Sequence, residues 1–244
     1  MKCIKCNHNN ADTSKYCSRC GNKLETYLYA CANRDCSEYG KDVSELKARF
    51  CHQCGQPIIN PACSINGREY VDLGLKVKWA ACNLGARYPE EYGNYYAWGE
   101  IEPKIEYSDL NSKTFSKDIL DISNTYSNDA AKSNWEIGWR MPSKEEAEEL
   151  IEKCTWYWIM QKGIRGYRVV GPNGNSIFLP ATGYRSFRDN YNDGIMGYIW
   201  TSSYDKNSNI SASCLCYDRL DRWVDNSFYR YLGATIRPVC YKCT

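Results

Sequence analysis

Eight cysteines in the first 60 residues form four close pairs, and this pattern constrains the chain more than any other feature. Tetrahedral zinc takes four soft ligands, and two short loops that each present two thiolates supply them. Because so short a segment buries little apolar surface, zinc binding provides much of its folding free energy, on the order of 10 kcal/mol per site. The pattern predicts two structural zinc ions rather than disulfides. The first is bound by Cys3, Cys6, Cys17 and Cys20, and the second by Cys31, Cys36, Cys51 and Cys54.

The spacing of these cysteines resembles tandem zinc ribbons, whose motif is roughly Cys-x-x-Cys followed by an aromatic residue and Cys-x-x-Cys-Gly. Residues 16–21 and 50–55 match the second half of this motif. The second ribbon departs from it in its first pair, where four residues rather than two separate the cysteines. His8 and His52 are the only histidines, and each lies in a ribbon that already has four thiols, so we expect neither to bind zinc.

The charge balance argues against nucleic acid as a partner. The whole chain has a formal charge of +2, and its first 60 residues contain nine Lys or Arg and six Asp or Glu. Each zinc held by four thiolates contributes −2, so the two folded ribbons together carry about −1, a poor match for phosphate. We therefore expect the ribbons to dock a protein partner or to act as a spacer.

Nothing in the sequence predicts contact with a membrane. No apolar run approaches the ~18 residues that span a bilayer. The first six residues include two cysteines and lack the apolar core of a signal peptide. Thiols stay reduced in the cytoplasm, where paired cysteines favour metal binding over disulfides. We therefore expect a cytoplasmic protein.

The composition changes near residue 60, because all eight tryptophans lie beyond it. The later segment has enough aromatic and apolar residues for a sizeable core, whereas the earlier one depends on metal. We expect a first zinc ribbon in residues 1–25, a second in 26–58, a proline-containing linker in 59–65 and a ligand-binding domain in 66–244.

One helix is predicted directly after Pro142. Ser143 and Glu146 form a capping box, in which each side chain can bind the backbone N–H of the other residue. The four glutamates at 145, 146, 148 and 149 are typical of a solvated face near the positive end of the helix dipole, and we favour this over a catalytic carboxylate cluster. Apolar residues at i, i+3, i+4 and i+7 mark the opposite face, namely Ala147, Leu150, Ile151 and Cys154.

Short strands are predicted on both sides of this helix. The turn at residues 171–175 contains Gly, Pro and Asn and predicts a hairpin between 166–170 and 176–179. One or two helices packed on short, mostly antiparallel strands make an α+β domain. Further strands are expected within 70–79, 198–202, 213–217 and 235–239.

Several motifs of this later segment resemble the Fibrobacter succinogenes major paralogous domain family, in the order that the family has them. This resemblance covers about residues 66–239. It implies a C-type lectin-like fold, similar to formylglycine-generating enzymes and to the variable proteins of diversity-generating retroelements. In such folds the first and last strands pair, and the C-terminal strands and loops display the binding face. The motifs lie at residues 70–75, 78–80, 96–100, 138–142, 171–181 and 236–239.

The family carries Tyr or Phe at many positions between the motif at 200–203 and the final Arg-Pro-Val, and this chain departs from that pattern. It has Cys214, Cys216, Leu232 and Ala234 at such positions. Retroelement mutagenesis replaces adenines and so converts Asn or Tyr codons into codons for residues of this kind. Diversification of a surface and ordinary drift among paralogues both produce this pattern, and both origins stay open.

The residues favour a binding protein over an enzyme. Residues 56–244 contain no histidine, which excludes His-based triads and His metal sites there. Tyr and Trp offer contact area at low entropic cost, as in antibody paratopes, and we expect a protein ligand. We expect the core to contain Trp79, Trp98, Trp139 and Trp200. We expect the ligand face to include Arg185, Tyr204, Cys214, Cys216, Arg219, Asp221, Arg222, Trp223, Asp225, Asn226, Phe228 and Tyr229.

Three alternatives remain at this stage. Cys214 and Cys216 lie two residues apart on one face of a strand, and they could serve an oxidase similar to formylglycine-generating enzymes. The domain could instead be a structural interaction protein with an invariant surface. Cys63, Cys240 and Cys243 come close together if the first and last strands pair, and they could form a third metal site that still lacks a fourth ligand.

Overall fold

The structure is a computed structural model, and it describes residues 18–19, 30–31, 37, 53, 58–59, 64–119, 122–136 and 138–241. The chain divides into two compact units, Met1–Gly67 and Arg68–Thr244. In the first unit, β1 (Ala30–Cys31) pairs with β2 (Ile58–Ile59) in antiparallel register, and β3 (Ser64–Ile65) follows. The pairing of β1 with β2 joins two ends of the predicted second ribbon.

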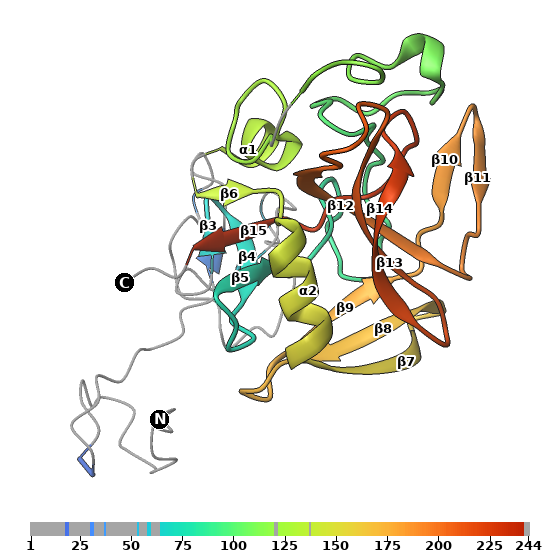
Figure 1. The fold of residues 1–244 in the computed structure, drawn as a ribbon. Coiled ribbons are helices and arrows are strands. Elements are labelled where there is room, and N and C mark those ends of the chain that lie inside the picture. The colour runs from blue at the N-terminus through green and yellow to red at the C-terminus, as the bar shows by residue number, and fades with distance from the viewer. Residues whose placement is uncertain are drawn as a thin grey trace. The chain divides into compact units, whose positions relative to one another are not determined.

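A central antiparallel sheet brings together segments from the start, middle and end of the second unit (Figure 1). Its strands β4 (Arg68–Val71), β5 (Val77–Ala80), β15 (Val239–Tyr241) and β6 (Trp139–Arg140) are neighbours in this order. Val239 lies opposite Trp79 on one side and Arg140 on the other. The predicted pair of short strands within 70–79 is confirmed. The last strand, β15, pairs with β5, the second strand of this unit, rather than with β4, the first.

Arg237 connects this sheet to its surroundings from a fully buried position just before β15. Its Nε donates to Oδ1 of Asn83 at 2.8 Å, and its Nη1 donates to the carbonyls of Ala80 and Ala81 at 3.0 and 2.7 Å. Its Nη2 donates to the carbonyl of Phe178 in another sheet at 2.7 Å. Burial lowers the pKa of Arg237 to about 10, and these acceptors take the place of the water that a guanidinium otherwise binds.

Helix α2 (Lys144–Lys153) confirms the predicted capping box, because Ser143 accepts from the N–H of Glu146 and Glu146 accepts from the N–H of Ser143. The prediction of a fully solvated glutamate face is wrong at two positions. Glu146 forms an ion pair with the buried Arg140. Glu149 is buried, where it accepts from the backbone N–H of Lys76 at 3.2 Å. Both carboxylates therefore attach the helix to the central sheet. The expected apolar stripe is also present, with Ala147, Leu150 and Cys154 buried and Ile151 partly buried.

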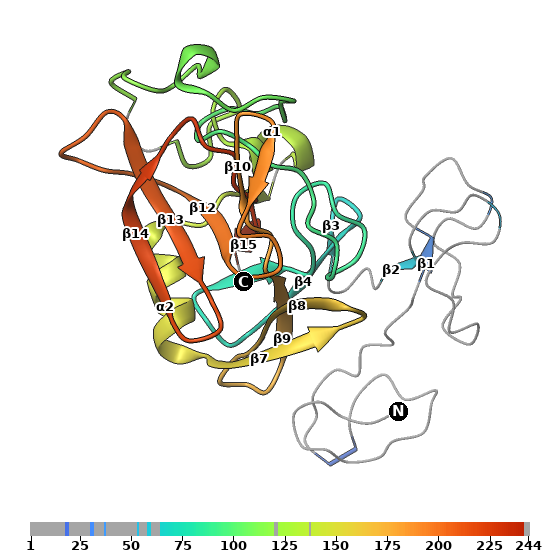
Figure 2. The ribbon, with the colours of Figure 1, turned by 90° about the vertical axis from the view of Figure 1, so that its right-hand side faces the viewer.

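Two three-stranded antiparallel sheets complete the core (Figures 1 and 2), and α2 packs against the second of them. The predicted hairpin around 171–175 and the strands at 198–202 and 213–217 are confirmed. The stretch at 235–239 is a strand only from Val239 onward, and Thr235 instead forms an isolated bridge with Ile199. The first sheet contains β7 (Thr155–Gln161), β8 (Ile164–Val170) and β9 (Ser176–Pro180), and the second contains β12 (Gly197–Tyr204), β13 (Ser211–Tyr217) and β14 (Arg222–Tyr229).

The remaining elements are small. They are a hairpin of β10 (Tyr184–Ser186) and β11 (Asp189–Tyr191), helix α1 (Ala130–Trp135) and one 3-10 turn, η3 (Asp109–Asn111). Helices are few and the strands are mostly antiparallel. Among the described residues, none of the helices has the length and apolar character needed to cross a membrane.

The four tryptophans expected in the core are there, each no more than 1% exposed. Two of them bind the backbone of other segments through the indole N–H. Trp98 donates to the carbonyl of Thr201 at 2.9 Å, and Trp200 donates to the carbonyl of Tyr96 at 2.8 Å. These two hydrogen bonds hold the segment around residue 97 against β12, although the bonded residues are 103 and 104 positions apart in sequence.

Candidate functional site

The predicted ligand-face residues lie mainly on β14 and on the turn that joins β13 to β14, with one on β10, one on β12 and two on β13. Nine of the twelve are exposed or half-exposed. Cys214, Cys216 and Phe228 are buried instead, with exposures of 0, 1 and 8%. Placing these three on the ligand surface was therefore wrong. The nine that remain are Arg185, Tyr204, Arg219, Asp221, Arg222, Trp223, Asp225, Asn226 and Tyr229.

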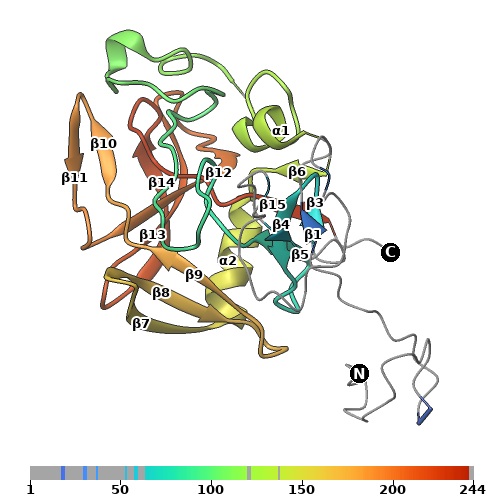
Figure 3. The ribbon, with the colours of Figure 1, turned by 180° about the vertical axis from the view of Figure 1, so that it is seen from behind.

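The register places these three buried residues on one side of the β12–β14 sheet, the side on which Tyr184 of the neighbouring β10–β11 hairpin packs (Figures 1 and 3). Tyr184 of this hairpin contacts Tyr198 edge-on at 5.1 Å between ring centroids and Phe228 at 5.6 Å. Phe228 in turn stacks on Tyr198 at 5.1 Å. Strand β13 is consequently covered on both sides, because α2 packs against the other one. Leu232 and Ala234, the other two expected surface positions, are also buried.

The register of the sheet shows which residues surround this covered area. Cys216 lies between Tyr198 and Trp223, so these three share one side of the sheet. Cys214 lies between Trp200 and Asp225 in the next row. Trp223 is 36% exposed and stands at the edge of the covered area, where a ligand can reach it.

Two stacked pairs of rings also reach the surface, one within the β10–β11 hairpin and one at the end of β14. Tyr191 lies on Tyr184 with centroids 5.4 Å apart and planes 18° from parallel. Tyr229 lies on Tyr231 at 5.6 Å and 12°. Tyr191 and Tyr229 are 43 and 45% exposed. We call the five residues Tyr184, Tyr191, Trp223, Tyr229 and Tyr231 the aromatic face.

Another aromatic residue packs against two rings of the aromatic face. Phe115, from the long segment before α1, contacts Tyr231 edge-on at 5.2 Å and Tyr229 at 6.5 Å. Burial raises the pKa of Tyr231, and the neighbouring hydroxyls of Tyr229 and Tyr184 add to this. Rings held in stacks lose little freedom when a ligand binds.

Arg185 supplies a positive charge on β10, where it follows Tyr184 in sequence. Its guanidinium carbon lies 4.8 Å from the centroid of Tyr95, and its backbone exchanges hydrogen bonds of 2.7 and 2.8 Å with Gly233. A Cβ on Gly233 would lie 2.9 Å from the ring of Tyr107, so only glycine allows this close approach. Within the part of the chain that the structure describes, Arg185 has no ion pair, and its buried Nε has no hydrogen-bond acceptor. Its charge is therefore free to bind a carboxylate of a ligand.

Sequence reasoning missed three members of the aromatic face, Tyr184, Tyr191 and Tyr231, and also Phe115, which packs against it. Tyr184 and Tyr191 come from a polar stretch whose Asp, Asn and Arg content is typical of a loop, and only the hairpin register, with Tyr184 opposite Tyr191, brings them together. Phe115 is more than 100 residues from its partners. A run of spaced tyrosines between residues 184 and 231 was the one available pattern.

The two thiols Cys214 and Cys216 are both buried on β13. Burial raises the pKa of Cys214 well above its ordinary value, and its hydrogen bond with Cys216 adds to this effect. Sγ of Cys216 donates to the carbonyl of Cys214 at 3.6 Å. The thiolate is the nucleophile and the metal ligand, so burial disfavours the reactive form of Cys214. Within the described residues no cluster of His, Cys, Asp or Glu is arranged to hold a metal.

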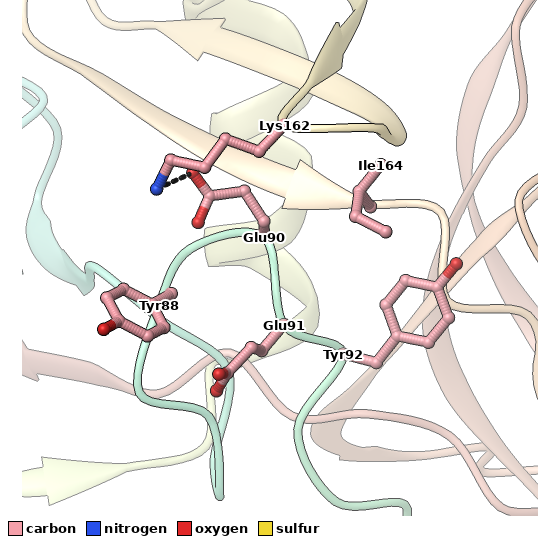
Figure 4. Close-up of a pocket in the computed structure, with 6 residues that line it drawn as sticks. All are labelled: Tyr88, Glu90, Glu91, Tyr92, Lys162 and Ile164. Carbon is pink, nitrogen blue, oxygen red and sulfur yellow. Dashed lines mark ion pairs between the residues drawn. The ribbon is translucent and has the colours of Figure 1, made fainter.

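A separate cavity of about 530 Å³ lies between the loop after β5 and the turn of the β7–β8 hairpin (Figure 4). Figure 4 shows Lys162 reaching from this turn to Glu90 on the loop, at 3.0 Å. Burial opposes ionisation of Glu90, but hydrogen bonds from Gln161 and Lys162 outweigh it and lower the pKa of this carboxyl. Glu91 in the same cavity accepts from the N–H of Arg87 at 2.6 Å. Both acids thus have partners, and Glu90 ties the loop to the hairpin.

A polar cavity of about 630 Å³ adjoins Tyr204, a predicted ligand residue. Arg230 lines it but is engaged, since Nε donates to the carbonyl of Ser211 at 2.9 Å and Nη1 to that of Lys117 at 3.0 Å. The guanidinium also lies 4.4 Å from the centroid of Trp98. The guanidinium that lines this cavity is therefore used in contacts within the protein. Tyr204 lies at this cavity and is not part of the aromatic face.

The predicted metal ligands fall mostly outside the described residues. Cys31 is in β1, and Cys3, Cys6, Cys17, Cys20, Cys36, Cys51 and Cys54 lie outside, as do His8 and His52. Cys240 is buried in β15, while Cys63 and Cys243 also lie outside. The donor set itself, four thiol pairs at ribbon spacing, fits tetrahedral zinc.

Comparison with known proteins identifies only the N-terminal part. Residues 3–55 match the double zinc ribbon family, which supports zinc binding by this segment. No match to the chain was found among curated proteins or among solved structures.

Proposed function

We propose that residues 66–244 form a C-type lectin-like domain of the Fibrobacter succinogenes major paralogous domain type, and that its aromatic face binds a protein ligand without catalysis. The two preceding zinc ribbons, each holding one structural zinc, dock a second protein or space the domain from it. The protein acts in the cytoplasm and binds neither nucleic acid nor membranes.

The family resemblance is supported by the way its motifs meet in space. The side-chain amides of Asn173 and Asn175 both donate to the carbonyl of Asp72, at 2.7 and 2.9 Å. A Cβ on Gly171 would lie 2.1 Å from the carbonyl oxygen of Leu73, which explains the glycine. Two motifs 100 residues apart thus depend on each other. The pairing of β5 with β15 and the buried Arg237 fit the same fold.

The binding role is carried by one observation, the stacked and exposed rings of the aromatic face. Large rings pre-ordered on a rigid sheet are typical of protein-binding surfaces, and the neighbouring Arg185 adds a directional charge. The buried state of Cys214 and Cys216 supports this role over the oxidase alternative, since a thiol without solvent access cannot reach a substrate.

Site-directed photocross-linking tests the proposal. A photoreactive phenylalanine analogue is placed at Tyr191 or Tyr229, and at Tyr126 as a control, because Tyr126 is 55% exposed but lies on the segment before α1. The two face positions are expected to capture the same protein from the native cells, and the control is not. Capture is expected to fall when Arg185→Ala is added. Equal capture from all three positions would refute a dedicated face.

The origin of the face is tested on DNA, by sequencing the gene and its flanks. A nearby imperfect copy of the codons for about residues 184–236, differing only at adenines and beside a reverse transcriptase gene, would establish a diversified receptor. The mismatches are then expected at codons of exposed residues such as Tyr191, Trp223 and Tyr229, and not at those of buried Cys214 and Cys216. Without such a copy, the protein has an invariant surface with one dedicated ligand.

A further inference from the structure

Strand β7 forms one edge of its sheet, and among the described residues nothing pairs with its outer side. The sheet order is β7-β8-β9, and Figures 1 and 3 show β7 outermost. Its sequence, Thr-Trp-Tyr-Trp-Ile-Met-Gln, has no charge, proline or glycine. Three of its side chains are exposed: Thr155 and two large ones, Tyr157 at 53% and Met160 at 63%.

The hairpin geometry decides which backbone groups face outward. Gln161 lies opposite Ile164 across the two-residue turn Lys162-Gly163, so this pair exchanges hydrogen bonds. Alternation along the ladder then directs the N–H and C=O groups of Trp156, Trp158 and Met160 away from β8. The carbonyl of Arg165 in β8 accepts from the N–H of Ala181 on the far side, as this alternation requires.

Edge strands in soluble proteins are normally protected by charge, proline or a bulge. The edge strand β14 has such protection, since it carries Arg222 and Asp225 and is interrupted by a register shift before Phe228. Strand β7 has none of these along seven residues. An apolar, regular and uncharged edge of this kind is a template for a further strand.

We propose that β7 pairs with β7 of a second copy of this chain, antiparallel about a two-fold axis at Trp158. In this register the outward groups of Trp158 bind those of its symmetry mate, and those of Trp156 bind those of Met160 in the partner copy. Each outward N–H and C=O of the three residues is then satisfied, and the two sheets become one continuous sheet.

The side chains also favour a second copy as the occupant. Strand β7 itself carries no charge, so it meets no like charge on the strand when it faces β7 of a second copy. Met160 of one copy lies beside Trp156 of the other, and thioethers pack well against aromatic rings. On the opposite side of the sheet, Tyr157 lies beside Ile159 of the other copy. Ile195, which is 59% exposed, borders the same surface as Trp158, Ile159 and Met160 and extends its apolar area beyond the strand, next to Arg165 and Arg219.

Molar mass in solution tests this pairing on the full-length, zinc-loaded chain. The chain of 28.1 kDa is expected to elute with twice this mass. Met160→Lys is expected to raise the dimer dissociation constant on the order of a hundredfold, because the two-fold axis places the substitution twice in the interface at about tenfold each. Tyr157→Lys, on the other side of the sheet, is expected to act in the same direction.

Leu110→Lys is the matched control, since Leu110 is 93% exposed on η3 and lies outside the strand. This variant is expected to remain dimeric.

Hydrogen exchange of the backbone amides tests the register of the pairing. The N–H groups of Trp156, Trp158 and Met160 are expected to be protected in the dimer and to exchange in Met160→Lys. A wild-type chain that is monomeric at roughly 100 µM, or a dimer that neither lysine variant dissociates, would overturn the pairing. Protection of these amides in a monomer would show that another segment of the same chain covers the edge, and would equally overturn it.

Discussion

Replacing Arg237 separates two contributions that a buried guanidinium makes to stability. Its four hydrogen bonds satisfy the side chain of Asn83 and three carbonyls. Arg237→Met has a similar length but no donors. Each acceptor left unpaired costs about 1–3 kcal/mol, so the four together cost on the order of 6 kcal/mol. Removal of the buried charge offsets part of this loss of stability. A pKa that burial lowers to about 10 corresponds to a cost of about 3 kcal/mol for burying the charged guanidinium, and methionine does not incur this cost.

The expected net loss in the free energy of unfolding is therefore about 3 kcal/mol for Arg237→Met, within the range that a domain of this size survives. Arg237→Lys keeps the charge but offers at most three donors, without the planar fork that reaches four acceptors. It is expected to lose more, about 5 kcal/mol. Stability thus falls in the order Arg, Met, Lys.

Urea unfolding followed by tryptophan fluorescence measures this difference. All eight tryptophans lie beyond residue 60, so the signal reports the second unit of the full-length chain. A lysine variant more stable than the methionine variant would refute the reasoning, because the charge itself, and not the fork of donors, would then be the stabilising element.

Three further predictions concern separate parts of the chain. Glu90→Gln is expected to lower the free energy of unfolding at pH 7 and to flatten the decline of this free energy in acid. The lowered pKa of Glu90 contributes stability that is present above 4.5, the ordinary pKa of this carboxyl, and that is lost as the pH falls through the folded-state pKa. Urea titrations at several pH values across pH 3 to 7 would measure this dependence. Cys214 and Cys216 are expected to resist a thiol reagent until the domain unfolds, as peptide mass mapping would show; rapid labelling of the native protein would contradict their burial. Elemental analysis is expected to give two zinc per chain, and a chelator is expected to leave the urea transition of the tryptophans unchanged; a third zinc would point to the C-terminal cysteines.

Local patterns were sufficient to predict elements with strong end signals. The capping box of Ser143 and Glu146 located α2, and the turn chemistry of residues 171–175 located the β8–β9 hairpin. Strand β7 was missed because Trp156, Tyr157, Trp158 and Ile159 are all large and apolar, so no alternation separates a buried side from an exposed one. Strand β14 was missed because its register shift interrupts the alternation.

The candidate site was harder to predict, because it depends on contacts between distant segments. The sequence indicated a face rich in tyrosine near the C-terminal strands, and Trp223 and Tyr229 are indeed exposed there. It gave no indication that Tyr184 of the β10–β11 hairpin would pack on the side of the β12–β14 sheet that carries Cys214 and Cys216, which is why these two were assigned to the surface. It also could not indicate that Phe115 would support Tyr231.

The central position of β15 has a consequence for how the domain forms during synthesis. Val239 must enter between Trp79 and Arg140, so the central sheet stays incomplete until residue 241 has left the ribosome. At about 5–20 residues per second, β5 waits roughly 10 to 30 s for this neighbour. During that interval its apolar residues and the unpaired edge of β7 are exposed to other nascent chains. The ribbons need no such delay, because all their ligands are translated first, and they can bind zinc and a partner while the rest is still being made.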